Sequence, residues 1–232
     1  MRTVLKKGLV IAVDGPSGVG KTTVSRLIAE KLGLRYVDTG AMYRAVALAA
    51  HGSGGVDIHS DEALENFCLK VKIDYDVPSG RVCVNGVDYT GRTRTQSAGR
   101  MASIVSKRTP VRKFLVEYQR TLGKAGSLVM EGRDIGTVVL PDADIKFFLD
   151  AKPEVRAGRR HRELSSEGAV LREAVESEIA DRDLRDTTRE DSPLKKAEDA
   201  IYVDTSGLDI EGVAARMLGH IKERLGVGDI RS

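Results

Sequence analysis

The residues with the clearest chemical meaning lie in one short segment near the start of the chain, which reads Gly-Pro-Ser-Gly-Val-Gly-Lys-Thr from Gly15 to Thr22. The glycines allow the backbone to wrap closely, so that its N–H groups point toward phosphate oxygens. Lys21 can reach the β and γ oxygens of a triphosphate, and the Thr22 hydroxyl can ligate Mg²⁺. We therefore expect a nucleoside triphosphate site rather than an ordinary glycine-rich turn. The expected contacts are Gly15, Pro16, Ser17, Gly18, Val19, Gly20, Lys21, Thr22 and Thr23.

The elements around this loop have the order of an α/β fold. Residues 9–13 are a run of apolar residues typical of a buried strand, and residues 21–32 have a helical pattern that ends at Gly33. Such runs alternate along the chain, which predicts a parallel sheet flanked by helices. Further strands are expected at 35–37, 128–130, 145–149 and 201–203, and helices at 41–50, at 109–123 with Thr109 as N-cap, after Pro153 and after Asp209.

The pattern changes between Phe67 and Gly91. Apolar and polar residues alternate there, and Pro78-Ser-Gly80 and Asn85-Gly86 form turn signals between the short runs. The segment predicts a small antiparallel meander. It is too short to bury a core alone, so we expect an insertion into the α/β domain.

Composition bounds the remaining choices. The chain has 232 residues, 37 Lys and Arg against 34 Asp and Glu, a net charge of +3, no Trp and 4% aromatic residues. This small excess of positive charge and the few aromatics disfavour a nucleic-acid partner. Cys68 and Cys83 are expected to be free thiols. Residues 1–8 lack a secretory signal and no long apolar run exists, so we expect no membrane contact and a cytoplasmic location.

Other triphosphate-binding classes lack their motifs. A GTPase needs an Asn-Lys-x-Asp guanine reader, but neither Asn66 nor Asn85 is followed by lysine. A motor ATPase usually carries adjacent acids after its magnesium strand, whereas Asp150 is followed by alanine. A small kinase remains, because phosphoryl transfer between two polyanions requires fixed cations.

Several arginines could supply these cations. Arg44 follows a Thr39-Gly40 turn, and Arg133 follows a strand, at the sheet edge where α/β folds bind ligands. A second set has the spacing of one helical face: Arg182, Arg185, Asp186 and Arg189. A third set crowds a short helix: Arg156, Arg159, Arg160 and Arg162. By residue type alone, this third set favours a solvated face paired with Glu154, Glu163 and Glu167; beside a phosphate loop, a mobile arginine lid is preferred.

Taken together, the motifs resemble the bacterial cytidylate kinase family over nearly the whole chain. The resemblance rests on the motifs Asp14–Thr22, Asp38–Arg44, Arg94–Gln96, Glu131–Val139 with Pro141–Ala143, and Arg182–Asp186 with Arg189. It implies a P-loop kinase with a five-stranded parallel sheet flanked by helices, a helical lid and a small β insertion. It also implies a single domain over 1–232, with a core at about 8–60 and 108–232, an insertion for the monophosphate at about 61–107 and a lid at about 155–185.

The resemblance also implies an activity and site roles. The family transfers the γ-phosphoryl group of ATP to CMP or dCMP with Mg²⁺, and we expect a monomer. The implied catalytic residues are Lys21, Arg133, Arg182 and Arg189, with Arg156, Arg159 and Arg160 on ATP and Thr22 on its Mg²⁺. The implied acceptor contacts are Thr39, Arg44, Arg133 and Arg189 on the phosphate, Ser103, Arg112 and Asp134 on cytosine, and Arg182 and Asp186 on the pentose. A carboxylate suits the cytosine N4 donor, and an arginine and a serine suit O2 and N3.

Three departures from the family pattern keep the same hydrogen-bonding classes. Glu131 stands where a smaller acid is expected, Thr39 where serine is common, and Lys21-Thr-Thr23 replaces a frequent Lys-Gly-Thr. Two alternatives stay open at this stage. One is a kinase of the same fold that acts on UMP, AMP or shikimate, and the other is a regulatory module that binds ATP without transfer.

Overall fold

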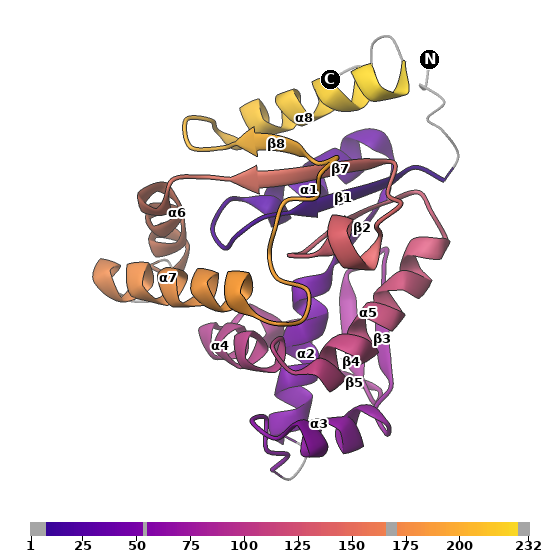
Figure 1. The fold of residues 1–232 in the computed structure, drawn as a ribbon, viewed down its shortest axis with the longest axis vertical. Coiled ribbons are helices and arrows are strands. Elements are labelled where there is room, and N and C mark those ends of the chain that lie inside the picture. The colour runs from indigo at the N-terminus through magenta and orange to yellow at the C-terminus, as the bar shows by residue number, and fades with distance from the viewer. Residues whose placement is uncertain (1–7, 53–54, 166–170, 227–232) are drawn as a thin grey trace.

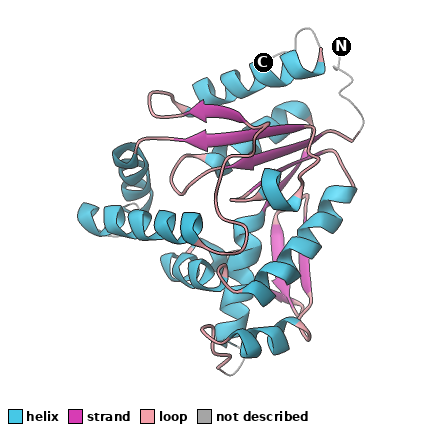
Figure 2. Cartoon of the chain, in the orientation of Figure 1, coloured by secondary structure: helices cyan, strands magenta, loops and turns pink. Residues whose placement is uncertain are grey.

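The computed structural model describes residues 8–52, 55–165 and 171–226, and a five-stranded parallel sheet organises them (Figures 1 and 2). The strand order is β2-β6-β1-β7-β8, with every neighbouring pair parallel. The strands are β1 (Val10–Asp14), β2 (Arg35–Asp38), β6 (Leu128–Glu131), β7 (Ile145–Asp150) and β8 (Ile201–Asp204). Their carboxyl ends therefore meet at one edge, as the alternation of elements predicts.

Helices cover both faces of this sheet. Helices α1 (Lys21–Leu32) and α8 (Ile210–Leu225) share one buried cluster with Ile11 and Val13 of β1. On the other face, α2 (Thr39–Gly52) and α5 (Thr109–Lys124) pack with Ala12 and with Met130 of β6. Successive residues of a strand thus serve opposite cores, which explains why these strands are apolar throughout.

The predicted meander is present as a second, antiparallel sheet at the lower end of the view in Figure 1. Its strands are β3 (Ile73–Asp76), β4 (Arg81–Val84) and β5 (Val87–Asp88). The predicted start at Phe67 is wrong, because residues up to Cys68 belong to helix α3 (Asp61–Cys68), which Ser60 caps. Asn85 and Gly86 have positive φ, as a tight hairpin turn requires.

The helices α6 (Pro153–Ser165) and α7 (Arg172–Thr188) extend from the body of the molecule, to the left in Figure 1. They have a small core of their own, formed by Ala157, Leu164, Val175 and Ile179. Below them in this view lies helix α4 (Gln96–Val105), which the 3-10 turn η1 (Arg92–Arg94) precedes in the chain. The short helical segment η2 (Ile135–Val139) follows β6.

Most predicted elements agree with the structure to within one or two residues at their ends, and the boundaries near Thr109 and Glu131 bear on the site. Asp209 caps α8 and Pro153 opens α6, as expected. Thr109, however, is the first helical residue of α5 and Arg108 is the N-cap; the Thr109 hydroxyl instead donates to Asp191. Strand β6 continues one residue beyond the predicted 128–130 and places Glu131 at its end. In the described part of the chain, no helix has the length and apolarity needed to cross a bilayer.

Candidate functional site

The loop between β1 and α1 has the backbone that phosphate binding requires. Gly15, Gly18 and Gly20 have φ values of 148°, 80° and 90°, a region that L side chains rarely adopt. A Cβ at Gly15 would lie 2.1 Å from the Leu149 carbonyl oxygen, and one at Gly18 would lie 2.9 Å from the carbonyl oxygen of Arg156. The loop therefore lies directly on the neighbouring backbone. Within the loop, Gly15 and Pro16 are buried, whereas Ser17 through Thr23 line an open cleft.

Lys21 lies at the start of α1 and curls back over the loop. Its Nζ donates to the Pro16 carbonyl oxygen at 2.6 Å, and the side chain is buried. Burial, together with the nearby Arg133, lowers the pKa of Lys21. The ammonium group therefore occupies a position where an anion would stabilise its charged form.

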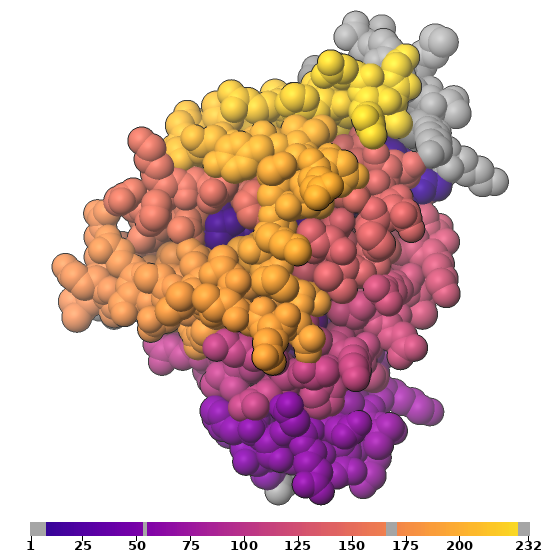
Figure 3. Space-filling view, viewed as in Figure 1, coloured from indigo at the N-terminus to yellow at the C-terminus, as the bar shows by residue number. Residues whose placement is uncertain are grey.

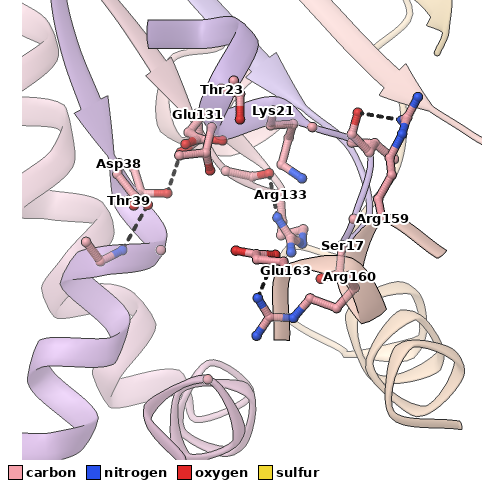
Figure 4. A pocket seen from close by; sticks show the side chains of 18 of the residues that line it. Ser17, Lys21, Thr23, Asp38, Thr39, Glu131, Arg133, Arg159, Arg160 and Glu163 are labelled. Atoms are coloured by element: carbon pink, nitrogen blue, oxygen red, sulfur yellow. Dashed lines mark hydrogen bonds and ion pairs between the residues drawn. The ribbon is translucent and has the colours of Figure 1, made fainter. Parts of the chain in front are cut away.

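Glu131, at the end of β6, is a site residue to which the sequence assigned no role of its own. Its carboxylate is buried and accepts a hydrogen bond from Tyr36, and the side chain of Thr22, the residue predicted to hold Mg²⁺, is close enough to lower its pKa. Burial and the carboxylate of Asp38 raise the pKa of Glu131, while Lys21 lowers it. Figure 4 shows Glu131, Lys21 and Arg133 around the same cavity. The sequence signal that could have identified Glu131 as a site residue is its position at the end of a strand, beside the phosphate loop.

These oxygens fit a magnesium ion that is shared with a nucleotide. Among the described residues, no group of three or more His, Cys, Asp or Glu side chains could hold a metal alone. Mg²⁺ in kinase sites does not require one, because it keeps several waters and takes one or two protein oxygens plus phosphate oxygens. The hydroxyl of Thr22 and the carboxylate of Glu131 are such hard oxygen donors, and they lie near each other.

Asp14 supports the loop from below. Its carboxylate accepts hydrogen bonds from the backbone N–H groups of Ile135 and Gly136, at 2.8 and 2.7 Å, and it is 4% exposed. Burial raises the pKa of Asp14 to about 6, against the effect of these two bonds. The bonds connect the end of β1 to the segment after β6 and thereby position Arg133 and Asp134 relative to the loop.

The cleft is large enough for two ligands. Its volume is about 1310 Å³, beyond the range of about 300–1,000 Å³ usual for one small-molecule pocket. The space-filling view in Figure 3 shows the indigo N-terminal part of the chain through an opening beside α6 and α7. The lining includes the loop at one end and, at the other, residues from distant parts of the sequence: Arg44, Ser103, Arg112, Arg133, Asp134, Arg182, Asp186 and Arg189.

Asp134 is the centre of the predicted base site. Arg112 pairs with its Oδ2, and Arg189 approaches its Oδ1 at 3.8 Å. All three residues are buried. Ser103 is also buried, and its hydroxyl has no hydrogen-bond partner among the described residues. The structure therefore brings the three predicted cytosine readers to one end of the cleft.

Asp186 joins the other arginines. It accepts from Arg133 Nε at 3.0 Å and lies 3.7 Å from Arg189 Nη1. Burial alone would raise the pKa of Asp186, but Arg133, Arg182 and Arg189 together lower it. Burial and Arg133 lower the pKa of Arg182 to about 10, so its guanidinium remains charged at neutral pH.

The prediction that Arg182, Arg185, Asp186 and Arg189 share one helical face is only partly correct. Helix α7 ends at Thr188, and Arg189 follows it in extended conformation. Its Nε donates to the Ser192 carbonyl, so the turn after the helix aims this side chain. Arg185 points elsewhere, since its Nε donates to the Asp181 carbonyl within the helix. Arg182, Asp186 and Arg189 line the cleft.

Arg44 and Thr39 lie at the start of α2. Arg44 Nη2 donates to Asp38 Oδ2 at 2.9 Å, while the other oxygen of Asp38 accepts from the Ala41 N–H. The Thr39 hydroxyl donates to the Glu131 carbonyl at 2.7 Å. Arg44 Nε is buried and has no partner among the described residues. Figure 4 shows Asp38 and Thr39 beside the cavity.

The arginines of α6 separate into two kinds. Arg159 and Arg160 line the cleft as predicted, with Arg160 paired to Glu163 at 2.8 Å. Arg156 differs from the prediction: it is buried, donates to the Ser17 and Ala151 carbonyls and pairs with Asp183. In this conformation it supports the loop from behind. Glu167, expected to pair with these arginines, lies outside the described residues.

A further wall of the cleft was not anticipated. The loop between β8 and α8 contributes Ser206, Gly207 and Leu208, and Ile210 contributes from the start of α8. Arg159 ties this loop to the α6 region, since its Nη2 donates to the carbonyls of Thr205 and Leu208 at 2.6 and 3.1 Å. The sequence signal that could have identified the loop between β8 and α8 is its position after a predicted strand, at the same edge of the sheet as the phosphate loop.

Comparisons with known proteins agree with this geometry. The family model for cytidylate kinase matches residues 11–223. A cytidylate kinase of Citrifermentans bemidjiense is 44% identical, with 99% of each chain covered, and one of Thermosipho melanesiensis is 48% identical, with 92% of this chain and 97% of the other covered. The solved structure of an uncharacterized protein from Eubacterium ventriosum is similar in fold, with a TM-score of 0.54 at 14% identity over 93% of this chain and 99% of that chain.

Proposed function

Because this chain belongs to the cytidylate kinase family, we propose that it transfers the γ-phosphoryl group of ATP to CMP or dCMP, which gives CDP or dCDP and ADP. The observation that carries the proposal is a single cleft with a phosphate loop at one end and buried arginines around two aspartates at the other. The first end suits a triphosphate and the second a nucleoside monophosphate.

ATP is proposed to bind with its triphosphate in the loop from Gly15 to Thr23. The Lys21 ammonium group then exchanges its hydrogen bond to the Pro16 carbonyl for contacts with the phosphates, which give its buried positive charge an anionic partner. Thr22 and Glu131 would hold the Mg²⁺ ion, which supplies charge neutralisation at the phosphate oxygens when bound. The adenosine part is proposed to lie in the cleft against the wall formed by Gly207 and Leu208, beside Arg159.

The acceptor is proposed to occupy the other end of the cleft. Thr39, Arg44, Arg133 and Arg189 hold its phosphate; Ser103, Arg112 and Asp134 bind cytosine; Arg182 and Asp186 bind the pentose. Several of these groups have buried donors or hydroxyls without partners among the described residues, at Ser103, Arg44 and Arg182. A polar ligand would satisfy them, since buried polar atoms are normally hydrogen-bonded.

Transfer at this site requires alignment and charge neutralisation rather than a general base. A phosphate oxygen of CMP is already ionised, so it attacks the γ-phosphorus in line without losing a proton. Lys21 at the donor end and Arg133 between the two ends are placed to stabilise the developing charge. The helices α6 and α7 form the proposed lid, residues 155–185, that excludes water; residues 166–170 of it lie outside the described part of the chain.

The remaining parts of the proposal concern organisation. One domain is divided into a core at about 8–60 and 108–232 and a monophosphate-binding insertion at about 61–107. The enzyme is proposed to act as a monomer in the cytoplasm.

Initial rates of ADP release with different acceptors test this function. CMP and dCMP should give the highest rates, followed by UMP, with AMP and shikimate near the rate without acceptor. A preference for AMP would contradict the role of Asp134 as a cytosine reader. Tight ATP binding without any CMP-dependent ADP release would instead indicate a nucleotide-binding module that transfers nothing.

A further inference from the structure

Tyr36 makes a contact that the mechanism above does not use. This residue lies in the middle of β2, and its hydroxyl donates to Oε1 of Glu131 on the neighbouring strand. Glu131 is the buried acid that lies near Thr22. One carboxylate thus connects the interior of the sheet to the residue predicted to hold Mg²⁺.

The strand register explains why this contact needs a glutamate. Asp38 is directly opposite Glu131, and Tyr36 is opposite Val129, two residues earlier. Tyr36 is therefore a diagonal neighbour of Glu131 on the same face of the sheet, a separation that only long side chains span. An aspartate at position 131 would be shorter by one methylene, about 1.5 Å. The unusual length of this acid and the tyrosine are matched to each other.

The tyrosine ring is fixed by its surroundings. It packs against the buried cluster beneath α1, and the guanidinium of Arg26 lies 5.1 Å from the ring centroid. Such a ring loses little entropy when its hydroxyl forms a hydrogen bond, because its two torsions are already restricted. The hydroxyl therefore offers Glu131 a donor at a fixed point.

We propose that Tyr36 is a positioning residue that fixes the carboxylate of Glu131 for the Mg²⁺ ion bound with ATP; this inference rests on the proposed function. Because Tyr36 occupies Oε1, the side chain is held in one rotamer, with Thr22 beside it. Partners that orient a metal-binding carboxylate typically change metal affinity by about 10- to 100-fold when removed. Thr22 remains close to this carboxylate, so the effect expected is nearer the lower end.

The experiment measures metal binding directly rather than turnover. Mn²⁺ is titrated into the full-length enzyme saturated with adenylyl imidodiphosphate, a non-transferring ATP analogue, and free Mn²⁺ is followed by electron paramagnetic resonance. The Tyr36→Phe variant should bind Mn²⁺ about five- to tenfold more weakly, with unchanged affinity for the analogue in the absence of metal. Tyr202→Phe is the matched control, because it removes a hydroxyl that also contacts an aspartate, Asp150, at an exposed site.

A double-mutant cycle separates positioning from packing. In a Glu131→Asp background the shorter acid cannot reach Tyr36, so Tyr36→Phe should have no further effect on Mn²⁺ affinity. Equal losses in both backgrounds, or no loss in the natural one, would overturn the inference. Failure of the proposed function has a different signature: the unaltered chain would bind Mn²⁺ with the analogue but form no CDP from CMP.

Discussion

The two ends of the cleft are built by different means. The donor end is one contiguous loop whose geometry comes from backbone, and its glycines lie against the Leu149 and Arg156 carbonyls. The acceptor end is assembled from side chains on α2, α4, α5, α7 and the end of β6. There the arginines are held by carboxylates, above all Asp134 and Asp186. A loop can be ready for phosphate without a counterion, whereas buried arginines cannot remain unpaired.

The carboxylates neutralise only part of the positive charge of the arginines at the acceptor end. Four buried or half-buried arginines surround two aspartates there, so two positive charges remain for the ligand: the arginines are Arg112, Arg133, Arg182 and Arg189, and the aspartates are Asp134 and Asp186. The phosphate of a nucleoside monophosphate is a phosphomonoester, which carries a charge of about −1.5 to −2 at neutral pH. The match favours a monophosphate over a neutral or monoanionic acceptor.

The largest expected effect comes from substituting one cation at each end of the cleft, and the two substitutions should affect different substrates. Lys21→Met should lower kcat by about 10³-fold and also weaken ATP binding, because the γ-phosphate loses a fixed charge. Arg133→Ala should lower kcat/KM for CMP by about 10²–10³-fold while ATP binding changes little. Steady-state rates and titrations with adenylyl imidodiphosphate measure both. CDP formation at a near-normal rate in Arg133→Ala would contradict its assigned role.

The next effect tests whether backbone geometry determines the donor end. Gly15→Ala places a Cβ 2.1 Å from the Leu149 carbonyl oxygen, whereas a Cβ at Gly20 would meet nothing within 4 Å. Both residues have positive φ. Gly15→Ala should therefore lower the free energy of unfolding by about 3 kcal/mol or more, and Gly20→Ala by about 1–2 kcal/mol from its backbone alone. Urea denaturation of the two variants measures the difference. Equal losses of unfolding free energy would mean that the backbone around Gly15 shifts to accept the Cβ without an energetic cost.

The third test changes recognition at the acceptor end without removing bulk. Asp134→Asn keeps the shape but replaces a carboxylate oxygen that can accept from cytosine N4 with an amide nitrogen. The ratio of kcat/KM for CMP over UMP should fall about 30-fold, equivalent to about 2 kcal/mol. Asp142→Asn, an exposed position on the loop before β7, is the matched control. A ratio unchanged in Asp134→Asn would place the base elsewhere in the cleft.

The sequence predicted the donor end well because its signals are local. A glycine pattern between an apolar run and a helical run specifies a strand, a loop and a helix in direct succession, and residues 10–32 have that structure. The acceptor end was predicted through the family resemblance. Spacing alone placed Arg185 on the same face as Arg182, whereas the end of α7 at Thr188 determines where Arg189 points. The direction of Arg189 after that end depends on the turn that follows, in which its Nε donates to the Ser192 carbonyl.

The contacts that the sequence did not predict are those that join distant segments. Tyr36 and Glu131 are 95 residues apart, and only the register of β2 beside β6 brings them together. Arg156 was expected on ATP from its helical neighbours, yet it reaches behind the loop to Ser17. Periodicity identifies the buried side of a helix, but it does not say which backbone carbonyl a long side chain will meet there.

The smallest expected effect concerns Asp14, which connects the two ends through Ile135 and Gly136. Its pKa in the folded chain is about 6, above the ordinary value of 3.8, because burial disfavours the charge. The folded state therefore binds this proton more tightly than the unfolded state does. The resulting stabilisation is complete below the ordinary pKa and is lost as the pH rises through the folded value. Between about pH 5 and pH 7 this loss is about 1 kcal/mol.

Asp14→Asn removes the titration but keeps an acceptor for one of the two backbone N–H groups. The variant should be less stable than the natural chain, because one buried donor loses its partner. Its free energy of unfolding should also decline less between about pH 5 and pH 7, by about 1 kcal/mol, when both proteins are compared by urea denaturation. Parallel pH profiles would mean that Asp14 ionises at its ordinary pKa despite its burial. The connection between the two ends would then be held by a fully charged carboxylate throughout this range.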